Sequence, residues 1–173
     1  MKTIELYFFR HGIAVNRGDP GITSDSDRPL TEEGARKTRV AAEGLKRLQI
    51  GFDKILTSPW LRAIQTAGIL AEVLELETGG LPELAGDRTV DDLLKALATQ
   101  RARRMLLVGH EPLLGNTVGR LICGAAEIQI ELKKSGACAV HSMTSKVRAG
   151  RAIAETFQPA RFAMPGRVTP LNT

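Results

Sequence analysis

Residues 105–109, Met-Leu-Leu-Val-Gly, form a continuous apolar run in the middle of the chain. A strand without polar residues on either face is typical of the centre of a parallel sheet, because helices cover such a sheet on both sides. Residues 4–9 form a second run rich in β-formers, which carries the pattern of a buried strand. The two runs predict that the chain folds around a buried, mainly parallel sheet.

Helical segments alternate with these strands. Thr31 is expected as an N-cap, with Glu32 and Glu33 in the first turn of a helix that runs to about residue 48. A short strand is predicted over residues 52–57, and Ser58-Pro59 is expected to start the next helix as cap and first helical residue. The apolar stripe of that helix is predicted to be Trp60, Ile64, Ala67, Ala71 and Leu74.

The second half of the chain continues the alternation. Val90, Leu94 and Leu97 mark a shorter helix, and a further helix follows the strand at 105–109. Residues 128–132, 137–143 and 152–157 read as short strands added antiparallel to one edge. The pattern predicts a three-layer α/β/α sandwich with a mainly parallel sheet and antiparallel edge strands. We expect one domain over residues 1–158 and a C-terminal tail over 159–173.

Composition narrows the class of protein. The chain has 173 residues, 43% of them hydrophobic and 25% charged, which is typical of a soluble globular domain that needs no metal or disulfide support. Cys123 and Cys138 have no metal-ligand spacing and are expected to be buried free thiols. The first apolar run carries Glu5 and lacks a cleavage site, so it is not a signal peptide, and a cytoplasmic location is expected.

Positive charge is concentrated at the C-terminal end. Residues 133–173 hold seven basic residues and one acid within a net charge of +5. This segment has no long run of cations and few aromatic residues, so a solvated face is favoured over a nucleic acid or an acidic partner. No uninterrupted apolar stretch is long enough for a membrane span, and neither a membrane nor a nucleic acid is expected as a partner.

Polar side chains follow three predicted strands. Arg10 and His11 follow the first, Ser58 and Arg62 follow the second, and His110 follows residues 105–109. Carboxyl ends of parallel strands meet at one edge of a sheet, where open α/β folds bind ligands. Because arginine matches phosphate oxygens with two parallel hydrogen bonds, a cationic phosphate site of two arginines and two histidines is predicted. A chance arrangement of surface charges is the alternative.

Other chemistries fit the sequence less well. It contains neither a P-loop nor a G-x-G-x-x-G motif, so sites that cradle a nucleoside triphosphate or a dinucleotide are excluded. The three histidines lack zinc-ligand spacing, so no metal is expected, and His141 is interpreted as structural.

Several motifs resemble those of one enzyme family. They are Arg10-His11-Gly12, Ser58-Pro59-x-x-Arg62-Ala63-x-Gln65-Thr66-Ala67 and Val108-Gly109-His110. Together they are similar to the signature of the histidine phosphatase superfamily, which has the phosphoglycerate-mutase-like fold. Within that superfamily, Arg28-Pro29-Leu30-Thr31 and Gly109-His110-Glu111-Pro112 resemble the SixA-type phosphohistidine phosphatases. The resemblance covers residues 3 to 157, and the tail lies outside it.

The resemblance implies a role for each site residue. His11 would be the nucleophile that carries the phosphoryl group, while Arg10, Arg62 and His110 would hold the phosphate oxygens. Water would then hydrolyse the phosphohistidine, with no metal or organic cofactor. Glu83 lies where larger family members place the glutamate that donates a proton, although a surface acid would look the same in the sequence.

The predicted function is hydrolysis of phosphohistidine on a phosphotransfer or signalling protein, through a covalent intermediate on His11. A site with a poor acid favours P–N over P–O substrates, because imidazole leaves readily with modest protonation. The short chain also leaves little room for a roof over the site, so the site is expected to be open enough for a protein substrate. The alternatives are a phosphatase of small phosphomonoesters and a non-catalytic phosphate-binding module.

Overall fold

The computed structural model describes residues 4–124, 130–142, 152–157 and 166–167. These residues form seven strands, four α-helices and two short 3₁₀ turns. The strands are β1 (Ile4–Arg10), β2 (Lys54–Thr57), β3 (Thr78–Gly80), β4 (Arg104–Gly109), β5 (Ala137–Ser142), β6 (Ala152–Phe157) and β7 (Gly166–Arg167). The helices are α1 (Glu32–Arg47), α2 (Leu61–Leu74), α3 (Val90–Ala98) and α4 (Leu113–Cys123), with the 3₁₀ turns η1 (Asp25–Asp27) and η2 (Pro82–Leu84).

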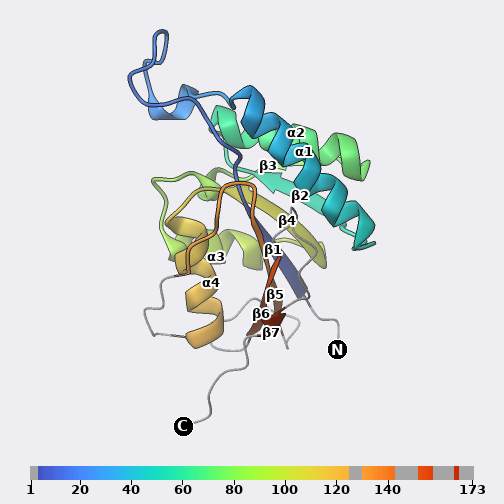
Figure 1. Ribbon diagram of the computed structural model, residues 1–173. Coiled ribbons are helices and arrows are strands. Elements are labelled where there is room, and N and C mark those ends of the chain that lie inside the picture. The colour runs from blue at the N-terminus through green and yellow to red at the C-terminus, as the bar shows by residue number, and fades with distance from the viewer. Residues whose placement is uncertain (1–3, 125–129, 143–151, 158–165, 168–173) are drawn as a thin grey trace.

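All seven strands belong to one sheet, in the order β3-β2-β4-β1-β5-β6-β7. Four neighbouring strands are parallel: β3, β2, β4 and β1. On the other side of β1 the pairing is antiparallel, β5 with β1, β6 with β5 and β7 with β6. Figure 1 shows α1 and α2 on one side of the sheet and α3 and α4 on the other. The predicted three-layer α/β architecture is therefore confirmed, including the antiparallel strands at one edge.

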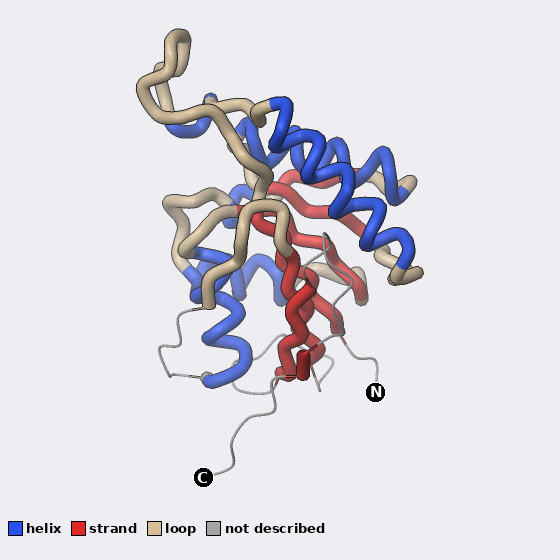
Figure 2. The backbone as a smooth tube through the Cα atoms, in the orientation of Figure 1, coloured by secondary structure: helices blue, strands red, loops and turns tan. Residues whose placement is uncertain are grey.

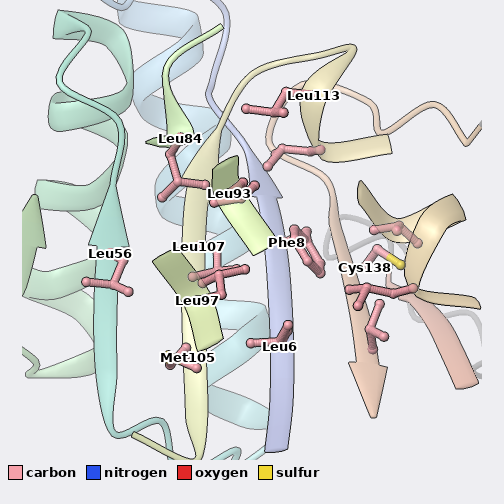
Figure 3. Packing of buried hydrophobic residues seen from close by; sticks show 14 of the residues in the cluster. Leu6, Phe8, Leu56, Leu84, Leu93, Leu97, Met105, Leu107, Leu113 and Cys138 are labelled. Carbon is pink, nitrogen blue, oxygen red and sulfur yellow. The ribbon is translucent and has the colours of Figure 1, made fainter. Parts of the chain in front are cut away.

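The central strand β1 supplies side chains to both layers of the core. Leu6 and Phe8 point toward α3 and α4, while Tyr7 and Phe9 point toward α1 and α2, as the two-residue period of a strand requires. Figure 3 shows Leu6 and Phe8 packed among residues of the neighbouring strands and of α3. β1 and β4 are thus held between two apolar layers, and the residues that follow them are fixed in place.

Helix α2 differs from the sequence prediction. It begins at Leu61 with Trp60 as N-cap, so Ser58 is not the cap; its hydroxyl accepts a hydrogen bond from the Trp60 N–H. The buried face is also different, because Ile64 is 47% exposed. The residues of α2 that face inward are Arg62, Ala63, Thr66, Ala67 and Leu70. Because several of these residues are small, α2 can lie close to the sheet and to α1. A prediction based on large apolar side chains does not detect a buried helix face made of small residues.

The structure also corrects two assignments near the edges of the sheet. Residues 130–132 have no regular structure, so the strand predicted over 128–132 is wrong there, and 128 and 129 lie outside the described residues. The sequence does not predict β3, because Thr-Gly-Gly has low β-propensity; this strand forms because its backbone pairs with β2. β7 pairs with β6 inside the segment predicted as a tail, and the domain boundary at 158 stays a prediction.

Among the described residues, no helix is both long and apolar enough to cross a membrane. The cytoplasmic location stays a prediction from the sequence.

Candidate active site

The carboxyl ends of β1, β2 and β4 meet at one edge of the sheet. β1 ends at Arg10 and β4 at Gly109, and these two residues are paired in register. The His11 N–H then donates to the Gly109 carbonyl at 3.1 Å, and the Ser58 N–H donates to Val108 at 3.0 Å. This register brings the imidazoles of His11 and His110 to a centroid distance of 4.9 Å.

The contacts of the His11 ring assign its proton. Nδ1 lies 2.7 Å from the Gly12 carbonyl oxygen, which can only accept, so Nδ1 carries the hydrogen. Nε2 accepts a hydrogen bond from the Arg62 Nε–H at 3.2 Å and therefore presents its lone pair to the guanidinium. Nε2 is therefore the nitrogen of this ring that carries a lone pair.

His11 is neutral at neutral pH. Burial lowers its pKa from 6.5 to about 4, and the charges of Arg62, Arg10 and Lys134 act in the same direction against the Gly12 hydrogen bond, which raises it. A lone pair on a neutral ring is what nucleophilic attack requires.

His110 is held from two sides. Its Nε2 lies 2.8 Å from the Ser58 hydroxyl, and the Trp60 ring packs against it at a centroid distance of 4.4 Å. The Ser58 oxygen already accepts from the Trp60 N–H, and in the tautomer in which the Ser58 hydroxyl donates to His110 Nε2 the ring proton lies on Nδ1. That Nδ1 is buried and has no hydrogen-bond partner among the described residues.

The site carries less positive charge than the sequence predicts. Burial, and then the neighbouring His11 and Arg62, lower the pKa of His110 to about 2. Both imidazoles are therefore neutral at neutral pH. The positive charge comes from Arg10 and Arg62, because arginine remains protonated in proteins.

The two arginines approach the site differently. Arg10 Nη1 donates to the Leu132 carbonyl at 2.7 Å, which leaves its buried Nε without a partner among the described residues. The Arg62 side chain is 4% exposed, and the face of its guanidinium lies 4.7 Å from the Trp60 ring. Its Nη1 and Nη2 donate to the backbone oxygen and to the carboxylate of Asp25, a residue that the sequence did not single out.

Glu83 stands apart from this cluster. It lies in η2, which packs beside β4, and its half-buried side chain makes no hydrogen bond or ion pair with the residues that the structure describes. Glu83 therefore lies next to β4, the strand that precedes His110, but it is not hydrogen-bonded to His11 or His110. Its role as proton donor stays a prediction.

Sequence reasoning also missed Thr66. Its hydroxyl accepts from the Gly12 N–H at 3.1 Å and donates to the Arg62 carbonyl at 2.7 Å, so it ties the chain after His11 to the first turn of α2. The motif around Arg62 contained this threonine, but its inward orientation depends on where α2 begins. Within the described part of the chain, no group of His, Cys, Asp and Glu side chains could hold a metal ion.

The fold and the site together define a class of protein. A neutral, oriented imidazole faces a buried arginine and a second histidine at the carboxyl edge of a parallel sheet, which suits binding and transfer of a phosphoryl group. This is an arrangement for phosphoryl chemistry on histidine.

Comparisons with known proteins agree with that class. The family model described as histidine phosphatase superfamily (branch 1) matches residues 6–86. The phosphohistidine phosphatase SixA of Escherichia coli is 35% identical over 126 residues, which cover 70% of this chain and 76% of that protein. An uncharacterized protein of Picosynechococcus sp. is 39% identical over 153 residues, 84% of this chain and 90% of that protein.

A solved structure agrees as well. The protein histidine phosphatase SixA in complex with tungstate superposes with a TM-score of 0.75 at 28% identity, over 91% of this chain and 98% of that chain. The chain belongs to the histidine phosphatase superfamily, in its SixA-type branch, and is a phosphatase.

Proposed function

We propose that this phosphatase hydrolyses phosphohistidine on a protein through a covalent intermediate on His11. The observation that carries the proposal is the orientation of the His11 ring, whose Nε2 lone pair faces Arg62 while its pKa lies near 4. A neutral imidazole with a fixed lone pair is prepared for attack on phosphorus, and the guanidinium beside it suits the oxygens of the phosphoryl group.

The proposed reaction has two steps. His11 Nε2 attacks phosphorus, the new N–P bond forms as the P–N bond of the substrate breaks, and the leaving imidazole nitrogen takes up a proton from water. Water then attacks the phosphoryl group, the Nε2–P bond breaks, and neutral His11 and inorganic phosphate are released. Arg62 Nε–H gives up its bond to Nε2 when phosphorus takes the lone pair, and it then donates to a phosphoryl oxygen.

The other site residues fit this scheme. The buried Nε–H of Arg10 and the Nδ1–H of His110 both lack partners in the described structure, so each has a hydrogen to donate to a phosphoryl oxygen. Fixed donors of this kind stabilise the charge that spreads over the oxygens during transfer. No step needs a metal or an organic cofactor.

Two points favour a phosphohistidine protein as the substrate. The matched relatives from Escherichia coli and Haemophilus influenzae are named as a phosphohistidine phosphatase and its homologue. Glu83 makes no contact that would hold it at the site, and imidazole needs less help from an acid than an alkoxide does.

A comparison of substrates tests the proposal. Turnover would be measured for phosphoramidate, for a phosphohistidine-bearing phosphotransfer domain and for an alkyl phosphate, with the phosphoenzyme trapped by rapid quenching in alkali. We expect the P–N substrates to be preferred and the label to reside on His11. A strong preference for the alkyl phosphate, or a phosphoenzyme labelled elsewhere, would contradict the proposal.

A further inference from the structure

Asp25 lies in η1, within the long segment between β1 and α1 that extends from the body of the molecule in Figure 2. Its carboxylate contacts three arginines. Oδ1 accepts from Arg17 Nε and from Arg28 Nη1, each at 2.7 Å, and Oδ2 accepts from Arg62 Nη2 at 3.0 Å. The backbone oxygen of Asp25 accepts from Arg62 Nη1 as well. Asp25 therefore binds the buried Arg62 side chain through two hydrogen bonds, one to its backbone oxygen and one to its carboxylate.

The two contacts fix the plane of the Arg62 guanidinium. A guanidinium is planar and has five N–H groups, so holding Nη1 and Nη2 at Asp25 also sets the direction of Nε. That direction is toward His11 Nε2. The Trp60 ring, at 4.7 Å, covers one face of the same group. The arrangement leaves one N–H on each Nη for a phosphoryl oxygen, so Asp25 orients Arg62 without using up its donors.

Asp25 also balances the charges that surround it. Arg28 is anchored a second time by its Nε, which donates to the Val15 carbonyl at 2.6 Å, and its side chain is 16% exposed. Arg28 and Arg62 are both largely withdrawn from water and repel one another, so an anion between them is needed to keep them together. Hydrogen bonds from Arg17, and then from Arg28 and Arg62, hold the pKa of Asp25 well below its usual range, and it stays ionised throughout the pH range of an assay.

We propose that Asp25 is a positioning residue for phosphoryl transfer, which holds Arg62 against the Nε2 atom of His11 and couples the β1–α1 segment to the site. The inference rests on the proposed function, because it assigns Asp25 a task within that reaction. The observations that support it are different, because they are the contacts of Asp25 with Arg17, Arg28 and Arg62.

The first experiment compares Asp25→Asn with Asp27→Asn. Asp27 lies in the same 3₁₀ turn, but its carboxylate accepts only from the Thr23 and Ser26 hydroxyls in the described structure, which makes it a matched control. With phosphoramidate as substrate, Asp25→Asn should lower kcat/KM about tenfold to a hundredfold, the range expected when a reacting group is misplaced. Asp27→Asn should leave kcat/KM unchanged. Asp25→Glu, which keeps the charge, should recover part of the loss.

A double-mutant cycle with Arg62→Ala separates positioning from a general effect on folding. If Asp25 acts through Arg62, Asp25→Asn should cost little further activity once the guanidinium is gone. Equal losses in the two backgrounds would overturn the proposal. So would tighter binding of inorganic phosphate and faster turnover by Asp25→Asn, because the carboxylate would then be a competitor of phosphate.

A measurement that needs no turnover keeps the two proposals apart. In ¹⁵N NMR spectra of the His11 ring, Nε2 should shift when the Arg62 hydrogen bond is lost in Asp25→Asn, while Asp27→Asn leaves it in place. If the wild type hydrolysed no phosphohistidine but the shift occurred, the proposed function would fail and the positioning role would stand. An unchanged Nε2 signal in Asp25→Asn would overturn the positioning role.

Discussion

The Nε–H of Arg62 donates a hydrogen bond to Nε2 of His11 at 3.2 Å, so the proposed nucleophile and a proposed phosphate-binding group are paired before any substrate arrives. The pairing joins the end of β1 to the first turn of α2, two segments 51 residues apart in the sequence. It identifies Nε2, and not Nδ1, as the atom that can attack, because Nδ1 is bound to the Gly12 carbonyl.

Replacing His11 should abolish the covalent intermediate. We expect His11→Ala to lower kcat for phosphoramidate by at least roughly a thousandfold, as loss of a nucleophile does, and to leave no alkali-stable phosphoenzyme. In the wild type, ³¹P NMR of the trapped enzyme should show phosphorus on Nε2. His141→Gln is the control, since that ring lies in β5, packs against Tyr7 and is half-buried outside the site. A phosphoenzyme of normal yield in His11→Ala would refute the covalent scheme.

The lowered pKa of His11 predicts how kcat/KM changes at acid pH. The free base attacks, and the pKa is lowered to about 4, so kcat/KM should hold as the pH falls from 7 to 5 and decline only as it approaches 4. An NMR titration of the His11 ring should give the same value. A midpoint near 6.5 in either measurement would mean that burial and the neighbouring arginines do not act on the ring as the geometry indicates.

The same shift predicts a loss of stability in acid. The unfolded chain binds a proton at His11 near pH 6.5 and the folded chain only near 4, so the free energy of unfolding should fall as the pH drops from 6.5 to 4. For His11 the full shift corresponds to about 3 kcal/mol. Urea unfolding at pH 7 and pH 5 should show a smaller pH dependence for His11→Asn than for the wild type. Equal dependence in the two proteins would remove His11 from this effect.

Thr66→Val should destabilise the fold and slow the reaction. The change leaves the Gly12 N–H without its acceptor in a buried position, which costs about 1–3 kcal/mol, and it loosens the chain that follows His11. Thr117→Val is the matched control: Thr117 is equally buried, but its hydroxyl only donates to the Leu113 carbonyl within α4. Urea unfolding and phosphoramidate turnover should separate the two variants, and similar losses of stability would argue against the Gly12 contact.

Much of the fold could be predicted because strand and helix patterns are local. The apolar run at β4, the Thr31 cap of α1 and the placement of His11 and His110 after parallel strands all follow from short stretches of sequence. Parallel topology then requires those strand ends to meet at one edge. The family motifs contain the same site residues, Arg10, His11, Arg62 and His110, so the motifs and the strand pattern point to the same site.

The parts that could not be predicted depend on contacts between distant segments. Asp25 is one of several acids in a polar stretch, and nothing local distinguishes it from Asp27 before the segment folds back on Arg62. The inward face of α2 depends on its start at Leu61, two residues later than the sequence indicates. The lowered pKa values of both histidines follow from burial, which only the packed structure reveals.

Glu83 offers the sharpest test of what this site can hydrolyse. If it donates a proton to the leaving group, Glu83→Gln should slow hydrolysis of an alkyl phosphate far more than that of phosphoramidate, because an alkoxide is the more basic leaving group.

The Glu83 side chain is half-buried in η2 and makes no hydrogen bond or ion pair with the described residues, so the substitution should leave stability within about 0.5 kcal/mol. The measurement is the ratio of kcat/KM for the two substrates in the wild type and in the variant. Glu77 is exposed and lies immediately before β3, and Glu77→Gln is a control that should leave the ratio unchanged. Equal slowing of both substrates by Glu83→Gln would remove Glu83 from the acid role and leave protonation of the leaving group to the substrate imidazole or to water, which would restrict the enzyme to P–N bonds.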